Sequence, residues 1–191
     1  VKMTGVEVDF SRLCRLDDRG NEVLVNEGEE DIRYRRWSIN KLWINNFLSF
    51  GEDNIIEYSN LKGLTVVNSI PANQGGKTIF SIDSLLFLFF GKTTKTDTAT
   101  EIFNTYTEKD EVTVGGQIDI DGEEYIIERK LFRKKTKTGN YKTSSELNFY
   151  RILVDGNKEN LEGEQRRETD SLISDTIGTY DAFMLSIIAL A

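Results

Sequence analysis

The chain has 191 residues, a net charge of −8, 38% apolar and 29% charged residues, a composition typical of one globular domain. One cysteine, Cys14, and no histidine exclude a disulfide framework, a zinc cluster and any histidine-based catalytic pair within the chain. The negative charge gives no bulk attraction to nucleic acid or an anionic membrane, so such binding requires a local patch. Phosphoryl chemistry remains open, since it depends on lysine, backbone N–H groups and Mg²⁺.

Residues 1–36 form an N-terminal extension with its own pattern. The alternating run "VEVDF", the turn sequence "DDRGN" and the apolar "EVLV" predict a β-hairpin, and "NEGEED" predicts an acidic loop. The first residues carry scattered charges without the apolar core of a secretory signal, and "LLFLFFG" is too short to span a bilayer. We therefore expect a cytoplasmic protein that has no membrane partner.

From Trp37 onward, the sequence predicts three strands and then a helix. "WSINKLWINNF" predicts a strand, "SFGEDN" a turn and "IIEY" a second strand. The β-branched run "GLTVVNSI" predicts a strand that is buried on both faces. "KTIFSIDSLLFLFF" is apolar almost all round, which predicts a helix packed beneath a sheet and ended by Gly91.

The second half of the chain is first β-rich and then helical. "EVTVGGQIDIDGEEYIIERKLF" predicts a hairpin that turns at Asp121-Gly122, and "SELNFYRILVDG" predicts a third strand. The polar, basic stretch between them, "RKKTKTGNYKTS", predicts a loop. A helix is expected to end at Gly178, and an apolar element capped by Thr179 follows. Because the last residues are hydrophobic, we expect this to be the first part of a longer polypeptide.

The stretch "PANQGGKT" predicts a P-loop, because a strand precedes it and an apolar helix follows. Gly-Lys-Thr alone is common in surface turns, so the prediction depends on these neighbours. Pro71, the only proline, stands at the first glycine position, where its fixed φ and missing N–H remove a backbone donor. Gln74 replaces another frequent glycine. We expect Mg·ATP to bind with lowered affinity.

These motifs occur in an order that resembles the opening of the SMC-like ATPases of DNA double-strand-break repair. That family includes bacterial SbcC and the large subunit of the phage recombination endonuclease. The shared features are "NFLSFG", a Walker A loop with asparagine at its third position, a helix ending in "FFGK", a "Y-x-I-x-R" strand and the closing "TYDAFMLSII". The resemblance covers roughly Ser38 to Ala191, and residues 1–36 lie outside it.

The resemblance implies an α/β fold, the N-terminal lobe of an ABC-type P-loop NTPase head, for residues 37–191. A β-rich sheet and the P-loop strand and helix would form this lobe, truncated near the Q-loop. The C-terminal half of the head, beyond a long coiled coil, would bring the signature motif, Walker B and the catalytic carboxylate. Further implied partners are a second head in a homodimer, an SbcD-like nuclease subunit and DNA, in the host cytoplasm if the source is a phage. This chain alone would hold nucleotide without efficient hydrolysis.

The resemblance also assigns residue roles. Lys77 would bind the β and γ phosphates as the catalytic lysine, Thr78 would bind Mg²⁺, and Asn73 would lie on the γ-phosphate side. Leu48 stands where many members have an arginine, so one phosphate contact is missing. The implied nucleotide-binding set is Ser49, Phe50, Asn73, Gln74, Gly75, Gly76, Lys77, Thr78 and Ile79.

A basic stretch without an acid in it is the candidate for contact with the DNA backbone. A solvated hairpin tip is the alternative, because charge runs are usually solvated. Trp37 and Trp43 are expected to pack in strands rather than stack on bases. The predicted DNA-contacting residues are Arg129, Lys130, Arg133, Lys134, Lys135 and Lys137, with Lys142 nearby.

Two other functions compete with a DNA-repair ATPase. A different P-loop enzyme, such as a small-molecule kinase, would need acceptor and lid residues after the helix, where this chain has a β-rich block. A degenerate P-loop module that only scaffolds a nuclease or DNA is supported by Pro71 and Gln74.

Overall fold

The computed structural model describes residues 15–16, 22–23, 36–61, 63, 65–68, 70 and 76–186. The chain divides into two units, residues 1–34 and 35–191. In the first unit, β1 (Arg15–Leu16) pairs antiparallel with β2 (Glu22–Val23). The "VEVDF" run of the predicted hairpin lies outside the described residues.

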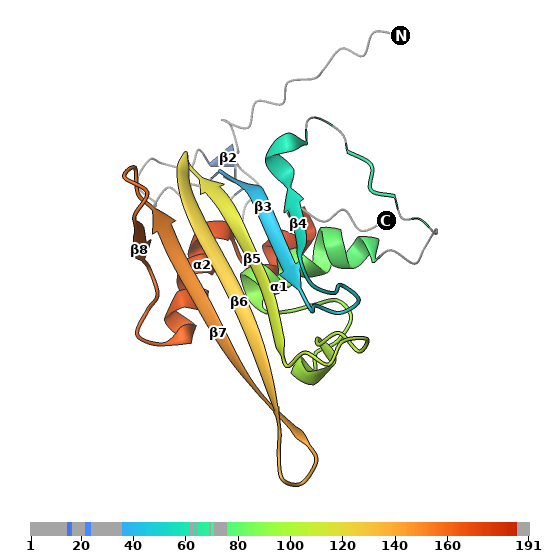
Figure 1. The fold of residues 1–191 in the computed structure, drawn as a ribbon. Helices are drawn as coiled ribbons and strands as arrows, with labels where there is room; N and C mark the ends of the chain where they lie inside the picture. Colours follow the sequence, from blue (N-terminus) through green and yellow to red (C-terminus); the bar gives the residue numbers. More distant parts are fainter. Residues whose placement is uncertain are drawn as a thin grey trace. The chain divides into compact units, whose positions relative to one another are not determined.

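The second unit is a mixed α/β structure around a 6-stranded sheet in the order β4-β3-β5-β6-β7-β8 (Figure 1). Every neighbouring pair of strands is antiparallel. The turn at Asp121 and Gly122 joins β5 to β6, as the sequence predicts. The strands are β3 (Trp37–Asn45), β4 (Asn54–Glu57), β5 (Glu111–Ile120), β6 (Glu123–Lys135), β7 (Tyr141–Ile152) and β8 (Lys158–Asn160).

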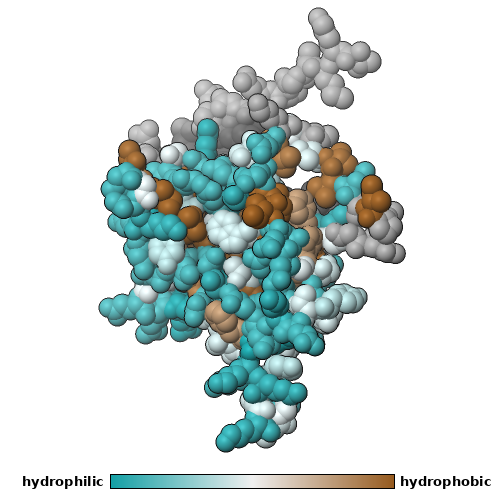
Figure 2. Space-filling model, in the orientation of Figure 1, coloured by the Kyte–Doolittle hydropathy of each residue, from teal (hydrophilic) through white to brown (hydrophobic). Residues whose placement is uncertain are grey.

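One face of this sheet forms the core. Alternating apolar residues such as Leu42, Ile44, Val114 and Ile127 are fully buried, as expected for an antiparallel sheet with one covered face. The helices α1 (Ser84–Phe90) and α2 (Arg166–Ile177) pack on that side, with α3 (Tyr180–Ser186) following in the chain. In the view of Figure 2, the side chains over the strands are mostly hydrophilic.

The predicted helices are confirmed over the described residues. The chain is helical from Lys77 to Phe90, with a π-helical turn at Ile79–Asp83 before α1. Gly91 ends the helix in the left-handed conformation, φ 66°, and its N–H donates to the carbonyl of Phe87 at 2.9 Å.

The stop of α2 at Gly178 and the Thr179 cap before α3 are also as predicted. At the start of α2 the Glu168 carboxylate accepts a hydrogen bond from the Gln165 N–H, and the helix stops at Gly178. The Thr179 hydroxyl accepts the Ala182 N–H at 3.3 Å, which caps α3.

The predicted loop "RKKTKTGNYKTS" is wrong for most of its length. Strand β6 runs to Lys135 and β7 starts at Tyr141, so only residues 136–140 form the turn. The ladder continues to the Lys135–Tyr141 pair, and the Thr136 N–H donates to the Asn140 carbonyl at 2.7 Å. Polar threonines and lysines suit this two-stranded hairpin because it projects from the sheet, where both faces meet water (Figure 1).

The strand predicted for "GLTVVNSI" is also wrong for the part that is described. Residues 65–68 belong to no strand, and Val66 and Val67 are 75% and 41% exposed. A strand requires a hydrogen-bonded neighbour, and the described sheet ends at β4 without one for these residues.

Among the described residues, no helix has the length and apolarity needed to cross a membrane.

Phe87→Ala tests where the core lies. Phe87 is 1% exposed and its ring lies 5.1 Å from that of Phe47, centroid to centroid. The substitution should lower the free energy of unfolding by about 3–5 kcal/mol because it leaves a cavity. Urea unfolding measures this, and Val154→Ala, at a fully exposed turn residue, should stay within about 0.5 kcal/mol of the wild type. Equal effects of the two substitutions would contradict the assigned core.

Candidate nucleotide site

The structure brings together sequence-predicted site residues from two separate segments. Gly76, which directly precedes the helix, has φ +61°, a conformation that favours glycine. A Cβ placed on Gly76 would lie 2.9 Å from the Ser49 Oγ, 3.1 Å from the Phe50 Cε2 and 3.7 Å from the Ile79 Cδ1. The predicted residues Ser49, Phe50, Gly76 and Ile79 are therefore neighbours in space, and any side chain at residue 76 would displace them.

The turn that carries Ser49 and Phe50 is held by its backbone. The Leu48 N–H donates to the Ile102 carbonyl at 2.8 Å, and the Phe50 N–H donates to the Phe47 carbonyl at 2.9 Å. Phe47 is fully buried, which anchors the turn in the core. Leu48 has φ 52°, a conformation that costs a non-glycine residue free energy and is found at functional sites.

Lys77 and Thr78 are the first two residues of the helix. The Ser81 hydroxyl donates to the Lys77 carbonyl at 2.8 Å, and the Phe80 N–H donates to the Gly76 carbonyl at 2.9 Å. Lys77 is half-buried, and Thr78 is exposed. The first N–H groups of a helix have no intrahelical partner and carry partial positive charge, so this end suits an anion. Asn73, Gln74 and Gly75, with Pro71, lie outside the described residues.

A buried carboxylate fixes this helix from its other side. Asp83 is fully buried, and its Oδ1 accepts the Thr94 N–H at 2.6 Å and the Thr94 hydroxyl at 2.8 Å. The contact ties the middle of the helix to the loop that follows Gly91. Sequence reasoning did not assign Asp83 a role, although an aspartate in an otherwise apolar helical run is the signal that would have found it.

Arg129, which the sequence predicts to lie in a basic surface stretch, is buried inside the protein. The side chain is 1% exposed, and its Nε and Nη2 donate to the carbonyls of Leu88 and Phe89 at 3.3 and 3.2 Å. Nη2 also donates to the Asp170 Oδ1 at 2.8 Å. The alternation of β6 turns Arg129 toward the helices, where a cation suits the C-terminal carbonyls of α1. Burial lowers the pKa of Arg129, and the Asp170 carboxylate opposes that shift.

The remaining basic residues fall into two groups. Lys130 lies 3.3 Å from the Glu128 carboxylate, and Arg133 pairs with Asp110 at 2.8 Å. Arg133 also lies over the rings of Phe103 and Tyr141, so it holds the base of the hairpin. The exposed group lies toward the end of the hairpin and consists of Lys134, Lys135, Lys137 and Lys142.

Both tryptophans lie in strand β3 and pack against other residues of the protein, as predicted. The Trp37 ring stacks on Phe183 at 5.9 Å and meets the edge of Phe89 at 5.3 Å. The Trp43 Nε1 donates to the Glu128 Oε1 at 3.1 Å across the intervening strand β5.

Within the described part of the chain, no three carboxylate, histidine or cysteine side chains gather into a group that could hold a metal. A P-loop magnesium ion does not need such a group on this side, because phosphate oxygens and one hydroxyl supply ligands. The exposed Thr78 hydroxyl in the first helical turn fits that role.

No family model matches this chain. The uncharacterized protein R555 of Acanthamoeba polyphaga mimivirus is 26% identical over 173 residues, which cover 88% of this chain and 12% of that protein. This chain therefore spans about an eighth of the curated relative that it matches. A solved structure of the recombination mediator protein RecF with ATP, in the RecFOR pathway, aligns at 18% identity and a TM-score of 0.42, over 69% of this chain and 30% of RecF.

Arg129→Met tests the structural role of the buried arginine. It removes the partner of Asp170 and of two helix carbonyls, so we expect a loss of about 2–4 kcal/mol in the free energy of unfolding. Urea unfolding measures this loss. Arg167→Ala, at an exposed residue of α2, is the control and should stay within about 0.5 kcal/mol. A fully stable Arg129→Met protein would contradict the assignment.

Proposed function

We propose that this chain is the ATP-binding N-terminal lobe of an ABC-type head in a DNA repair or recombination ATPase. The supporting observation is the meeting of Gly76 with Ser49 and Phe50 at the start of the helix. The sequence resemblance assigns these separate segments to one nucleotide site, and nothing in local sequence requires them to touch.

In this proposal Mg·ATP lies at the start of the helix. The Lys77 ammonium binds the β and γ phosphates, and the Gly76 N–H and the helix N-terminus face them. Thr78 coordinates the Mg²⁺ that arrives with ATP, and Ser49 and Phe50 form the neighbouring wall. Asn73, Gln74 and Gly75 supply the rest of the loop, and Pro71 lowers the affinity by removing one donor.

Turnover in this proposal requires the C-terminal half of the head and a second head. Support comes from the apolar residues ahead of the loop, since Val66, Val67 and Ile70 are 75%, 41% and 99% exposed. Exposed apolar, β-branched residues mark a surface that another element covers. We propose that strands of the C-terminal half cover them, and that an SbcD-like nuclease and DNA associate with the assembled head.

A scaffold with a degenerate P-loop is the second candidate, and Pro71 and Gln74 favour it. The two candidates differ in ATP hydrolysis by the full-length protein. The ATPase candidate requires turnover that Lys77→Ala abolishes, and the scaffold requires none.

Lys77→Ala tests nucleotide binding directly. Calorimetric titration of the 191-residue chain with Mg·ATP should show binding at least tenfold weaker in the variant, about 1.4 kcal/mol. The physical reason is the loss of the cation that faces the phosphates. Lys95→Ala is the matched control, because Lys95 is an exposed lysine in the loop after Gly91 and is not among the predicted nucleotide-binding residues. Identical titrations of Lys77→Ala and wild type would refute the proposal.

Charge reversal at Lys134, Lys135 and Lys137 tests DNA contact by the hairpin. In the assembled head it should weaken DNA binding and reduce the slope of log K against log [salt] by at least about 2, because fewer counterions are released. Fluorescence anisotropy at several salt concentrations measures both quantities. Lys158→Glu, on β8 at the edge of the sheet, is the control. An unchanged slope would show that the hairpin tip is only solvated.

A further inference from the structure

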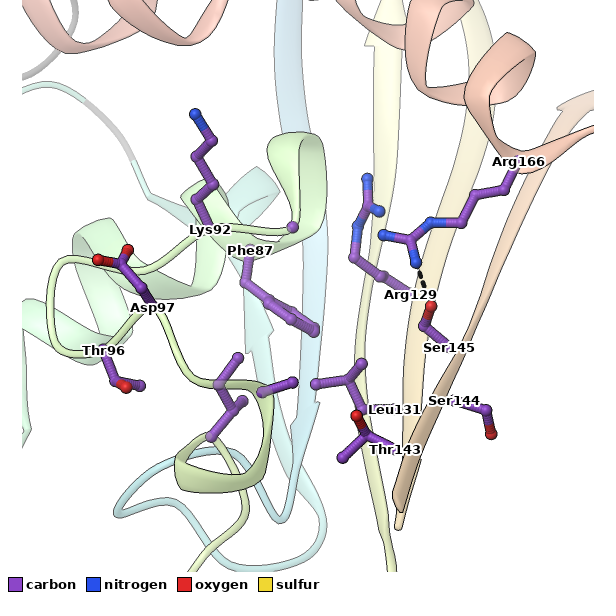
Figure 3. A pocket seen from close by; sticks show the side chains of 13 residues that line it. Phe87, Lys92, Thr96, Asp97, Arg129, Leu131, Thr143, Ser144, Ser145 and Arg166 are labelled. Atoms are coloured by element: carbon purple, nitrogen blue, oxygen red, sulfur yellow. Dashed lines mark hydrogen bonds between the residues drawn. The ribbon is translucent and has the colours of Figure 1, made fainter. Parts of the chain in front are cut away.

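A cavity lies at the opposite end of the helix that carries Lys77. It has a volume of about 220 Å³ and lies between the C-terminal end of α1, the loop after Gly91, the base of the β6–β7 hairpin and the start of α2 (Figure 3). The helix separates the cavity from the proposed nucleotide site by about 20 Å, at about 1.5 Å per residue. Figure 3 shows the Arg129 and Arg166 guanidinium groups side by side on one wall.

One buried nitrogen in this wall has no partner. Although the Nε and Nη2 of Arg129 are hydrogen-bonded, its Nη1 is buried and has no hydrogen-bond partner among the described residues. A buried charged donor without an acceptor is costly and uncommon. The guanidinium therefore retains unused capacity for one more acceptor on this side.

The absence of a side chain at Gly91 leaves space in front of both guanidinium groups. A Cβ on Gly91 would lie 3.2 Å from the Arg129 Nη1 and 3.6 Å from the Arg166 Nη2. Gly91 itself lines the cavity. Space beside Gly91 is thus within reach of two separate cationic nitrogens, which is the arrangement that an oxyanion requires.

Positive charge exceeds negative charge around this space. Arg129 and Arg166 share one carboxylate, that of Asp170, at 2.8 and 3.5 Å. Lys92 and Asp97 add one charge of each sign to the lining, and the Lys92 ammonium lies 4.3 Å from the centre of the Tyr180 ring. The charge of Arg166 contributes to the lowered pKa of Arg129, after the larger effect of burial. A bound anion would relieve this repulsion.

The wall is held in position for binding. The Ser145 hydroxyl accepts a hydrogen bond from the Arg166 Nη1, which fixes that guanidinium against β7 (Figure 3). The hydroxyl-bearing residues Thr143 and Ser144 line the same strand side of the cavity. At about 220 Å³ the cavity is smaller than the roughly 300–1,000 Å³ of pockets that enclose drug-sized ligands, so it suits one small group.

We propose that this cavity binds a single phosphate group between Arg129 and Arg166. Planar guanidinium groups match the oxygens of phosphate, and two of them converge here. The group is either a free phosphate ion or one phosphate of a nucleic-acid backbone lying along the adjoining hairpin. The site is independent of the proposed nucleotide site, since Lys77 takes no part in it.

The test is a titration of the 191-residue chain with inorganic phosphate, against chloride at matched ionic strength, followed by amide chemical shifts. The chain carries Lys77→Ala so that phosphate at the proposed nucleotide site does not contribute. We expect saturable shifts at Gly91 and along β7, and at least tenfold weaker binding in Arg166→Ala. Arg166 is partly exposed at the first turn of α2, so this variant should fold.

Arg167→Ala is the matched control, because Arg167 is the adjacent exposed residue of α2 and does not line the cavity. It should bind phosphate like the parent. Equal binding by Arg166→Ala and Arg167→Ala, or shifts that never saturate, would overturn the proposal. Given a saturable site, an oligonucleotide without terminal phosphates that displaces the ion identifies a nucleic-acid backbone as the source, and failure to displace it identifies the free ion.

Discussion

The second unit depends on one buried cation. The Arg129 guanidinium leaves strand β6 on its covered face, binds the last carbonyls of α1 and pairs with Asp170 on α2. Burying a guanidinium costs free energy, and hydrogen bonds in fixed geometry must offset that cost. Those hydrogen bonds set where α1 ends, and Gly91 can then turn the chain beside the guanidinium. One side chain thus links the sheet to both helices.

With its C-terminal end held in this way, the helix from Lys77 to Phe90 has a defined start as well. The Asp83 carboxylate binds Thr94, which ties the middle of the helix to the loop after Gly91. Its first residues consequently face the Ser49–Phe50 turn, whose own backbone is held against the core. The structure therefore places the start of this helix beside the Ser49–Phe50 turn and the Arg129 and Arg166 guanidinium groups beyond its other end.

The order of charges along the sequence does not show which basic residues of the stretch are paired with acids in the folded protein. The sequence from Arg129 to Lys142 contains no acid, yet Arg133 pairs with Asp110, which precedes β5. Antiparallel pairing brings these residues together because the two strands run side by side in opposite directions. Only the lysines toward the hairpin end remain exposed, so the surface available to a polyanion is smaller than the sequence implies.

Local patterns determined much of the fold. Period-two alternation identified most of the strands, an apolar run identified the helix that starts at Lys77, and Gly91 and the Asp121-Gly122 pair marked its stop and a turn. Such signals depend only on neighbours in the chain. The burial of Arg129, the meeting of Ser49 with Gly76 and the exposure of Val66 were decided by tertiary structure. They depend on which distant segments pack together, and residue periodicity carries no information about that packing.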